Sequence, residues 1–268
     1  MRESLIKSAI RATVFPPGAV RRIRFGPLRG YRFQVGAVTG MAPWYSGAER
    51  PEQDAIGRAL KSGARAIDVG ANWGLHTLLM ARVVGPSGSV WAIEPCPSVV
   101  ESLRWHVAAN GCAQVTVHAC AAFDRDGEVC FAEGVDPTQG HVAKDGTSVP
   151  ARRLDTLWRD AGSPPVAFIK IDVEGAERQV LAGAEALIGA CRPVLLIGPD
   201  SMFPDAKVYA EQLRRLGYRF TRLQDGRELT HCTYGHPAPD GFWGTILARP
   251  VSREHVNDEP RTGNREPL

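Results

Sequence analysis

The stretch IDVGANWG, residues 67–74, places an acid between two apolar residues and follows it with a glycine-rich turn. Ile67 and Val69 flank Asp68, and two glycines and an asparagine follow before position 75. A short apolar run is typical of a buried strand, and glycine allows the backbone to turn sharply. The stretch therefore predicts a buried strand that bends directly into a helix.

Strands and helices alternate on both sides of this turn. Apolar runs predict strands over 64–69, 89–94, 115–121, 166–172 and 193–198, with later strands over 218–223 and 242–248. Apolar periodicity, with proline and glycine at the boundaries, predicts helices over 49–63, 73–84, 98–110, 175–190 and 205–216. Ser98 and Glu101 have the spacing of a capping box at the start of the third helix. Short strands over 20–40 and a hairpin of 127–134 with 147–155 complete the pattern.

This alternation predicts an α/β fold with a single doubly wound, mostly parallel sheet and helices on both faces. We expect a basic, β-rich lead over 1–50, one domain over 51–249, and a polar, disordered tail over 250–268. In such folds ligands bind beyond the carboxyl ends of the strands. The chemistry is therefore expected from residues that directly follow strands.

The turn after the first buried strand favours a cationic ligand. A dinucleotide fingerprint needs glycines two and five positions after Gly70, where this chain has Asn72 and Leu75. An acid two residues before Gly70 suits a positive charge better than a pyrophosphate, and S-adenosylmethionine is such a ligand. A tight strand–helix turn that holds no ligand is the alternative.

Two further acids follow predicted strands. Glu94 lies one β-α-β unit after Asp68, and its two acceptor oxygens suit the hydroxyls of a ribose. In FIKIDVEGAE, residues 168–177, Lys170 and Asp172 face the same side of a strand. This pair is either a structural ion pair or part of a reaction site, with Asp172 beside the transferred group and Glu174 at the mouth.

Composition sets limits on the class of protein. The chain has 268 residues, 44% of them hydrophobic, and no apolar run reaches the roughly 18 residues of a membrane span. We expect no signal peptide, because the opening residues lack an uninterrupted apolar segment. Six cysteines without a C-x-x-C pair favour reduced, buried thiols in a cytoplasmic protein.

Positive charge is concentrated at the start of the chain. Residues 1–50 hold nine Lys/Arg and two Asp/Glu, whereas the remainder holds 23 and 27. The lead is either a solvated hairpin face or a surface with weak attraction to an anionic membrane or a phosphate-bearing substrate. No nucleic-acid-binding motif is present, so we predict no nucleic acid partner.

The motifs together resemble the FkbM-type S-adenosylmethionine-dependent methyltransferases. The similarity covers roughly residues 20–200. The matching segments are IDVGANWGLHTLLMA (67–81), VWAIEPCPSVVESLRWHVAANG (90–111), CAAFDRDGEVCFAEG (120–134), RRLDTLW (152–158) and FIKIDVEGAERQVLAGAEALI (168–188), preceded by WYSGAERPEQDAIGRALKSG (44–63). The combination of DVGAN, EP and IKIDVEGAE is more specific than any one of them.

The resemblance implies a seven-stranded, Rossmann-like methyltransferase sheet whose last strand is inserted antiparallel. It implies S-adenosylmethionine as donor and a hydroxyl of a small molecule, often a sugar or natural product, as acceptor. The residues implied for cofactor binding are Asp68, Gly70, Asn72 and Gly74 for the methionine part, Glu94 for the ribose, Ala121 and Ala122 for the adenine edge, and also Ala71, Trp73, Thr77 and Asp172.

The chain departs from the family pattern at three positions, and these departures affect the expected acceptor side more than the donor side. Gly198 stands where members commonly carry a glutamate, with Asp200 nearby. Ala176 replaces a frequent histidine, and His76 replaces a frequent aromatic residue.

For the chemistry, Asp172 and Glu174 are the first candidates for a general base, and His76 and His141 are weaker ones. Trp44, Tyr45, Trp73 and Phe203 are candidates for the walls of a desolvated site. A metal held by Asp172, Glu174 and Asp200 is a weak alternative, and we predict none. Two other functions stay open, a binding protein that kept the cofactor pocket and a nucleotide-dependent oxidoreductase.

Overall fold

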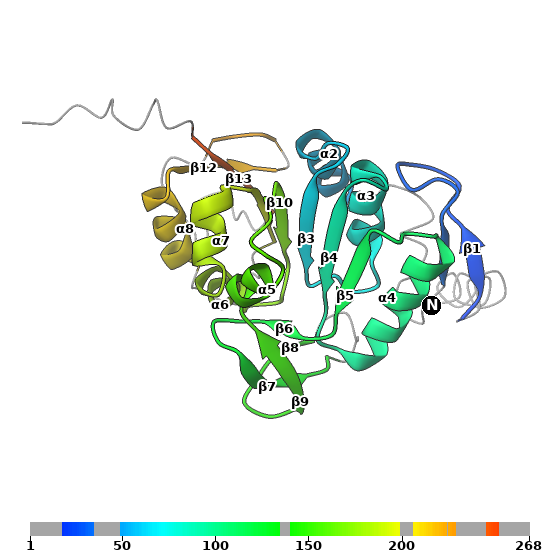
Figure 1. Ribbon diagram of the computed structural model, residues 1–268, viewed down its shortest axis with the longest axis horizontal. Helices are drawn as coiled ribbons and strands as arrows, with labels where there is room; N and C mark the ends of the chain where they lie inside the picture. Colours follow the sequence, from blue (N-terminus) through cyan, green and yellow to red (C-terminus); the bar gives the residue numbers. More distant parts are fainter. Residues whose placement is uncertain are drawn as a thin grey trace, which may run out of the picture.

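A seven-stranded sheet forms the centre of the computed structural model, which describes residues 18–34, 49–134, 140–198, 206–223, 225–228 and 245–251 (Figure 1). Its strands are β3 (Arg65–Val69), β4 (Ser89–Ile93), β5 (Val115–His118), β10 (Phe168–Ile171), β11 (Val194–Ile197), β12 (Tyr218–Arg222) and β13 (Ile246–Pro250). Their order is β12-β13-β11-β10-β3-β4-β5, and β13 runs antiparallel to both of its neighbours. The expected sheet with an antiparallel last strand is confirmed.

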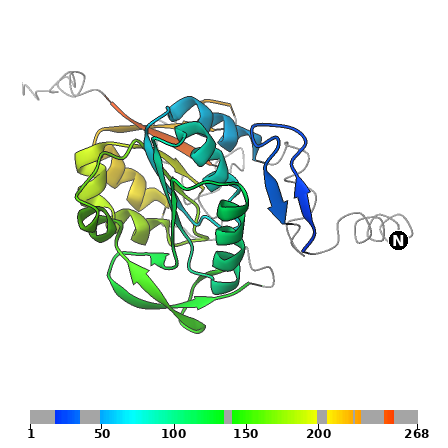
Figure 2. The same cartoon turned by 45° about the vertical axis from the view of Figure 1, so that its right-hand side comes forward.

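Helices cover both faces of this sheet, as the apolar strands require (Figures 1 and 2). The first face carries α2 (Arg50–Ala59), α3 (Leu75–Val84) and α4 (Pro97–Ala109). The second carries α5 (Leu154–Asp160), α6 (Glu177–Ala182), α7 (Glu185–Cys191) and α8 (Ala206–Arg215). Alternate strand residues divide between the two cores: Ala66 packs with α2 and α3, whereas Ile67 packs with α5 and α7.

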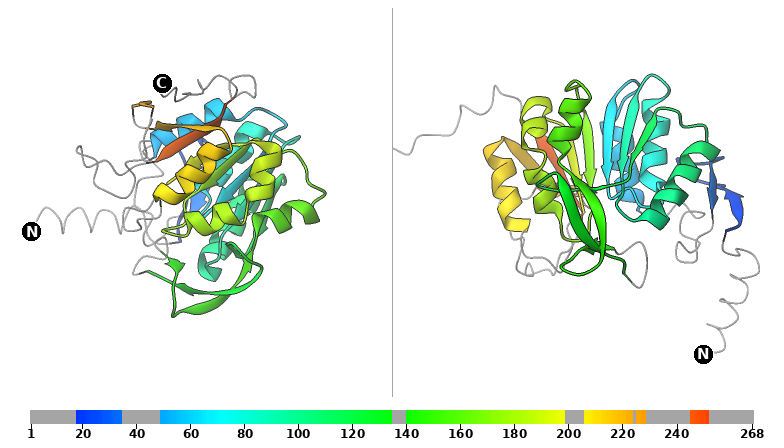
Figure 3. Two further views of the ribbon diagram at one scale, coloured as in Figure 1. Left: turned by 90° about the vertical axis from the view of Figure 1, so that its left-hand side faces the viewer. Right: turned by 60° about the horizontal axis from the view of Figure 1, so that its bottom comes forward.

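Two smaller sheets accompany the central one, in the two places where the sequence indicated short strands over 20–40 and a hairpin of 127–134 with 147–155. The first is the hairpin of β1 (Val20–Arg22) and β2 (Arg32–Gln34). The second contains β6 (Ala121–Ala122), β7 (Gly127–Ala132), β8 (His141–Val142) and β9 (Thr147–Arg152), in the order β6-β9-β7-β8. Figure 3 shows this four-stranded sheet beside one end of the central sheet, where β3, β4 and β10 terminate.

The strand expected over 115–121 is divided. β5 ends at His118, and the Cys120 amide donates to the His118 carbonyl oxygen at 3.0 Å, which turns the chain away from β4. Ala121 and Ala122 then pair with β9 instead. The turn therefore moves these two alanines from the central sheet to the four-stranded one.

Two helix predictions also need correction. The capping box is wrong, because α4 begins at Pro97 with Cys96 as its N-cap and has no side-chain cap. The helix expected over 175–190 is two helices, α6 and α7, which meet at Gly183. A Cβ at Gly183 would lie 2.0 Å from the Phe123 carbonyl oxygen, so this glycine lets the helix junction pack directly on a neighbouring backbone. The apolar residues that give 175–190 its helical period are nevertheless all buried: Ala176, Val180, Leu181, Ala184, Leu187 and Ile188.

Two predictions from composition concern membranes and thiols. Within the described ranges, no helix combines the length and apolar character that a bilayer crossing requires. The five cysteines in that part of the chain are free thiols: Cys96, Cys112, Cys120, Cys130 and Cys191. The sixth, Cys232, lies outside the described residues, as do Trp44, Tyr45, Asp200 and Phe203.

Candidate active site

The turn after β3 brings two strand ends into close contact. The amides of Gly70 and Ala71 both donate to the Ile93 carbonyl oxygen at 3.0 Å, which ties the turn to the end of β4. Gly70 has φ 72°, and a Cβ there would lie 1.9 Å from the Asp172 carbonyl oxygen. Any side chain at position 70 would collide with this carbonyl oxygen, so only glycine is compatible with the close contact between the ends of β3 and β10.

A cleft lies at these strand ends, and its walls come from both larger sheets. The residues that line it are Val69, Gly70, Asn72, Ile93, Glu94, Pro95, Ala121, Ala122, Phe131, Gly140, Val142, Asp172, Val173, Glu174 and Ala176. The ends of β4 and β10 supply its acidic groups, Glu94, Asp172 and Glu174, and the four-stranded sheet supplies mostly apolar ones. The cleft therefore combines carboxylates with an apolar wall.

Glu94 is buried in this cleft and fixed by backbone donors. The Asn72 amide donates to its Oε2 at 2.9 Å, and the Cys96 amide donates to its Oε1 at 3.0 Å. Burial raises the pKa of Glu94, and the two backbone hydrogen bonds oppose that rise. Each carboxylate oxygen keeps a further acceptor site, so Glu94 can still accept two ligand hydroxyls.

A second cavity, of about 100 Å³, lies on the other side of Asp172. It is lined by Glu49, Glu52, His76, Lys170, Asp172, Leu196, Gly198 and Thr245. Asp172 lines both cavities, so it lies where they meet. A Cβ at Gly198 would lie 2.8 Å from Asp172 Oδ1. The glycine that departs from the family pattern therefore makes room for the Asp172 carboxylate.

Lys170 holds the two strand-end aspartates. Its Nζ is 3.1 Å from Asp172 Oδ2 and 3.7 Å from Asp68 Oδ1. Burial alone would lower the pKa of Lys170, but the carboxylates of Asp172 and Asp68 raise it above its ordinary value. Asp68 is fully buried and accepts a 2.6 Å hydrogen bond from the Thr77 hydroxyl. Lys170 is therefore a charged, buried group that orients Asp172.

His76 presents a neutral imidazole to the second cavity. The residue is 6% exposed, and its Nε2 has no hydrogen-bond partner within the described part of the chain. Glu49 Oε2 is the nearby charge, at 3.5 Å. Burial, reinforced by the positive charge of Lys170, lowers the pKa of His76 to about 3. The Nε2 atom can therefore interact with a molecule in this cavity.

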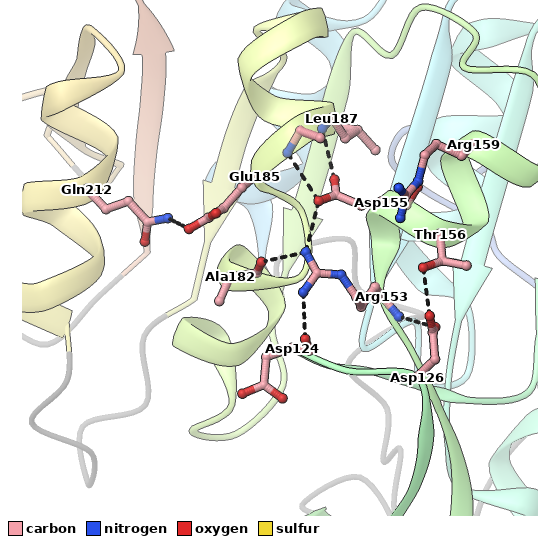
Figure 4. Close-up of polar contacts among 11 residues, drawn as sticks. Asp124, Asp126, Arg153, Asp155, Thr156, Arg159, Ala182, Glu185, Leu187 and Gln212 are labelled. Atoms are coloured by element: carbon pink, nitrogen blue, oxygen red, sulfur yellow. Dashed lines mark hydrogen bonds and ion pairs between the residues drawn. The ribbon is translucent and has the colours of Figure 1, made fainter.

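A polar network fixes the wall that follows β6 (Figure 4). Arg153 donates to the Asp124 carbonyl oxygen at 2.7 Å and to the Ala182 carbonyl oxygen at 3.3 Å. Asp155 is 3.2 Å from Arg153 and accepts the amides of Ala186 at 3.1 Å and Leu187 at 2.9 Å. The network thus joins the chain after Ala122 to the start of α7.

The structure brings some of the predicted site residues together and separates others from the cleft. Those that line the cleft are Gly70, Asn72, Glu94, Ala121, Ala122, Asp172 and Glu174. Those that do not line it are Asp68, Ala71, Trp73, Gly74 and Thr77. Gly74, with φ 91°, starts α3, where a Cβ would lie 2.6 Å from Leu103 Cδ1. Their roles in cofactor binding stay predictions.

Sequence reasoning missed the contribution of β7 and β8. Phe131 and Val142 line the cleft and are cross-strand neighbours of the four-stranded sheet, with Gly140 directly before β8. His141 lies between two lining residues but does not line the cleft itself. The alternation in GEVCFAEG indicated a strand whose buried face includes Phe131, but nothing in the pattern indicated what that face meets.

Comparison with known proteins assigns this arrangement to a family. Residues 68–220, more than half of the chain, match the family described as "Methyltransferase FkbM domain". The chain belongs to the FkbM methyltransferase family. The matched part is thus an S-adenosylmethionine-dependent methyltransferase domain, as the motifs predicted, and the match favours this assignment over an oxidoreductase.

Individual relatives match the chain only in part. A 31-O-demethyl-FK506 methyltransferase FkbM from Streptomyces tacrolimicus is 28% identical over 164 residues, which covers 48% of this chain and 62% of the relative. A protein-L-isoaspartate O-methyltransferase from Caenorhabditis elegans is 32% identical over 104 residues, 39% of this chain and 46% of the relative. The chain therefore spans about half the length of these curated relatives.

Among solved structures, the methyltransferase FkbM from Methylobacillus flagellatus KT matches with a TM-score of 0.46 and 23% identity. That match covers 71% of this chain and 44% of the solved one.

The residues of the cleft fit S-adenosylmethionine. Glu94 offers acceptor oxygens for ribose hydroxyls, and Ala121, Ala122 and Phe131 form an apolar wall suited to adenine. Asp172 and Glu174 also line the cleft and add two carboxyl groups, which supply the negative charge that a sulfonium and an ammonium require. This agreement in charge and polarity is independent of the sequence match.

Proposed function

We propose that this protein is an O-methyltransferase that methylates a hydroxyl of a small molecule, such as a sugar or a glycosylated or polyketide-type natural product. The donor binds in the cleft that contains Glu94, and the acceptor binds in the second cavity, beyond Asp172. The family, the position of Asp172 between the two cavities and the charge of the second cavity support this proposal.

The charge of the second cavity is the observation that favours a hydroxyl group as acceptor. Glu49, Glu52 and Asp172 contribute three carboxyl groups, and its one lysine, Lys170, is already 3.1 Å from Asp172. A carboxylate acceptor would meet like charges at short range. A neutral hydroxyl avoids this repulsion. The cavity therefore favours an alcohol over a carboxylate as acceptor.

Asp172 is the residue best placed to act as general base. When bound, S-adenosylmethionine supplies a methyl group from its positively charged sulfur. The Asp172 side chain is 46% exposed at the junction of the cavities, so its carboxylate can reach the hydroxyl proton of an acceptor and later release it to solvent. Lys170 holds that carboxylate in one orientation. Glu174 lines only the donor cleft, which makes it the weaker candidate.

Transfer of labelled methyl groups tests the proposal. The full-length protein is incubated with methyl-tritiated S-adenosylmethionine and a panel of sugars, glycosides and polyketide alcohols. We expect label in an alkali-stable ether. Label that alkali releases would show a methyl ester and overturn the choice of a hydroxyl. Donor binding without transfer to any member of the panel would favour a binding protein that kept the pocket.

Two isosteric variants separate the candidate bases. Asp172→Asn is expected to lower kcat by about 100-fold or more and to weaken donor binding, measured by calorimetry, by a much smaller factor. Glu174→Gln is the matched control and is expected to retain kcat within about fivefold. Wild-type kcat in Asp172→Asn would remove Asp172 from this role and leave His76, Glu49 and Glu52 as the other candidate bases in the cavity.

A further inference from the structure

The β1–β2 hairpin, residues 18–34, is firmly attached to the domain through its inner face. Ile23, Leu28 and Phe33 are buried, and the Phe33 ring stacks on His106 of α4 with centroids 4.0 Å apart. The Arg32 amide donates to Asn110 Oδ1 at 2.7 Å, and Asn110 Nδ2 donates back to the Arg32 carbonyl oxygen at 2.8 Å. The hairpin is therefore a rigid platform and not a loose extension.

Arg82 of α3 fixes the turn of the hairpin. Its Nη1 donates to the carbonyl oxygens of Pro27 at 2.8 Å and Arg29 at 3.0 Å, and its guanidinium lies 5.1 Å from the centre of the Tyr31 ring. These contacts hold residues 23–31, which connect the two strands, in one position relative to α3. The side chains on the outer face of the hairpin are therefore presented in a fixed arrangement.

The exposed surface of the hairpin combines positive charge with apolar groups. Five arginines are exposed, and residues 18–34 contain no Asp or Glu: the arginines are Arg21, Arg22, Arg24, Arg29 and Arg32. Phe25 is 62% exposed and Val20 is 40% exposed, and these are the two exposed large hydrophobic residues in the described part of the chain. Both lie on this hairpin, although its core already contains three other apolar side chains. Packing of the domain does not account for Phe25.

We propose that the β1–β2 hairpin docks on an anionic lipid bilayer. The arginines lie against the headgroup phosphates, and Phe25, in the loop between the strands, enters the interfacial region of the bilayer. An aromatic ring beside arginines is suited to a membrane interface, where apolar contact and attraction to anionic lipids add together. A bare phosphate backbone of RNA or DNA would attract the arginines but offers no apolar layer for Val20 and Phe25. The charge and the apolar exposure together therefore favour lipid.

This proposal does not depend on the identity of the methyl acceptor. The hairpin packs on α3 and α4 and contributes no residue to either cavity. In Figure 2 it lies on the flank of the domain beyond α4, away from the four-stranded sheet that forms one wall of the cleft. Docking through the hairpin would therefore leave the cleft accessible.

Vesicle co-sedimentation of the full-length protein tests the docking surface. The vesicles contain equal parts of phosphatidylglycerol and phosphatidylcholine, and vesicles of phosphatidylcholine alone are the reference. We expect binding to the anionic vesicles that weakens as salt is raised, because salt screens the exposed charges. Arg24→Glu with Arg29→Glu is expected to reduce the affinity at least about tenfold, since each exposed arginine contributes to attraction by the surface.

The chain offers a matched charge control at the opposite side of the molecule. Arg219 and Arg249 are exposed cross-strand neighbours on β12 and β13, so Arg219→Glu with Arg249→Glu makes the same change in net charge far from the hairpin. We expect that variant to bind within about twofold of the wild type. Phe25→Ser, which leaves the charge unchanged, is expected to reduce binding by about fivefold or more. Because Phe25 is exposed, Phe25→Ser is expected to keep the fold. It therefore tests the proposal even if the double arginine variant misfolds.

Four outcomes would overturn the proposal. They are an absence of binding to anionic vesicles, equal binding to both kinds of vesicle, equal losses in the two double-arginine variants, and unchanged binding of Phe25→Ser. Single-stranded RNA is added as a competitor. If it displaces the protein from the vesicles at an RNA phosphate concentration below the lipid phosphate concentration, the hairpin is instead a nucleic-acid-binding surface.

Discussion

Lys170 is a residue on which both strand-end carboxylates depend. It is 5% exposed and lies within 3.7 Å of Asp68 and 3.1 Å of Asp172. Substitution by the similarly shaped methionine leaves the fully buried Asp68 carboxyl without its cation. We expect Lys170→Met to lower the free energy of unfolding by about 3–5 kcal/mol, measured by urea denaturation.

A second substitution and a surface control check this prediction. Asp68→Asn in the Lys170→Met background removes the unpaired carboxyl and is expected to recover part of the loss. Lys61→Met makes the same change at an exposed position and is expected to stay within about 0.5 kcal/mol of the wild type. Equal stability of the Lys170 and Lys61 variants would show that the buried ion pair contributes nothing.

His76 makes stability sensitive to acid. Its pKa is lowered to about 3 in the folded protein, mainly by burial, whereas the unfolded chain has a value of about 6.5. Between these values the unfolded state binds a proton that the folded state does not, so the free energy of unfolding falls as pH falls. His76→Gln removes this term. Between pH 7.5 and pH 5 we expect the wild type to lose about 2 kcal/mol more than the variant in urea denaturation.

Other buried histidines do not obscure that comparison. His106, whose pKa burial lowers to about 4, is present in both proteins and contributes equally to each. Identical losses in wild type and His76→Gln would mean that His76 is protonated in the folded protein near neutral pH. Its Nε2 would then be a donor to Glu49 and not an acceptor.

At the scale of elements, Asp155 determines how α5 and α7 join. It is 3% exposed, accepts two amides at the start of α7 and pairs with Arg153 at 3.2 Å. Asp155→Ala leaves these donors unpaired in a buried place, and we expect a loss of about 3 kcal/mol in the free energy of unfolding. The Asp160 side chain, paired with Arg152 at 2.8 Å, is 64% exposed. Asp160→Ala is therefore the control, with an expected loss under about 1 kcal/mol.

The same region shows why some elements escaped prediction. The periodicity over 175–190 correctly indicated one apolar face, because all of its members are buried. The break at Gly183 depends on contacts with Phe123 and Asp155, which are distant in sequence. The supposed capping box had the required spacing, but Pro97 already starts α4 one residue before Ser98. Local pattern therefore predicted the elements and missed the boundaries that tertiary contacts set.

At the scale of the whole molecule, the central sheet could be predicted and the full cleft could not. Acids and glycines that follow strands indicate one edge of an α/β sheet, which is why Asn72, Glu94 and Asp172 were found. Phe131 and Val142 reach the cleft only because the chain leaves the central sheet after His118. Such a change of sheet has no local signature. The part of the apolar wall that β7 and β8 form was therefore missing from the prediction, whereas Ala121 and Ala122 of the same sheet were implied by the family resemblance.

That wall should determine donor affinity. S-adenosylmethionine at about 100 times its Kd raises the free energy of unfolding by about 2.7 kcal/mol, provided that it binds only the folded protein. Phe131 is buried on β7 and lines the cleft, whereas Val129, two residues earlier on the same buried face, does not. We expect Phe131→Ala to weaken donor binding about tenfold, since a large apolar contact with the ligand is lost. At the same donor concentration its stabilisation would fall to about 1.4 kcal/mol. Val129→Ala is expected to lower the free energy of unfolding of the free protein. The rise in that free energy on adding the donor is expected to stay at about 2.7 kcal/mol. Thermal unfolding with and without donor measures both effects, and equal increments in the two variants would mean that the donor binds without contact to β7.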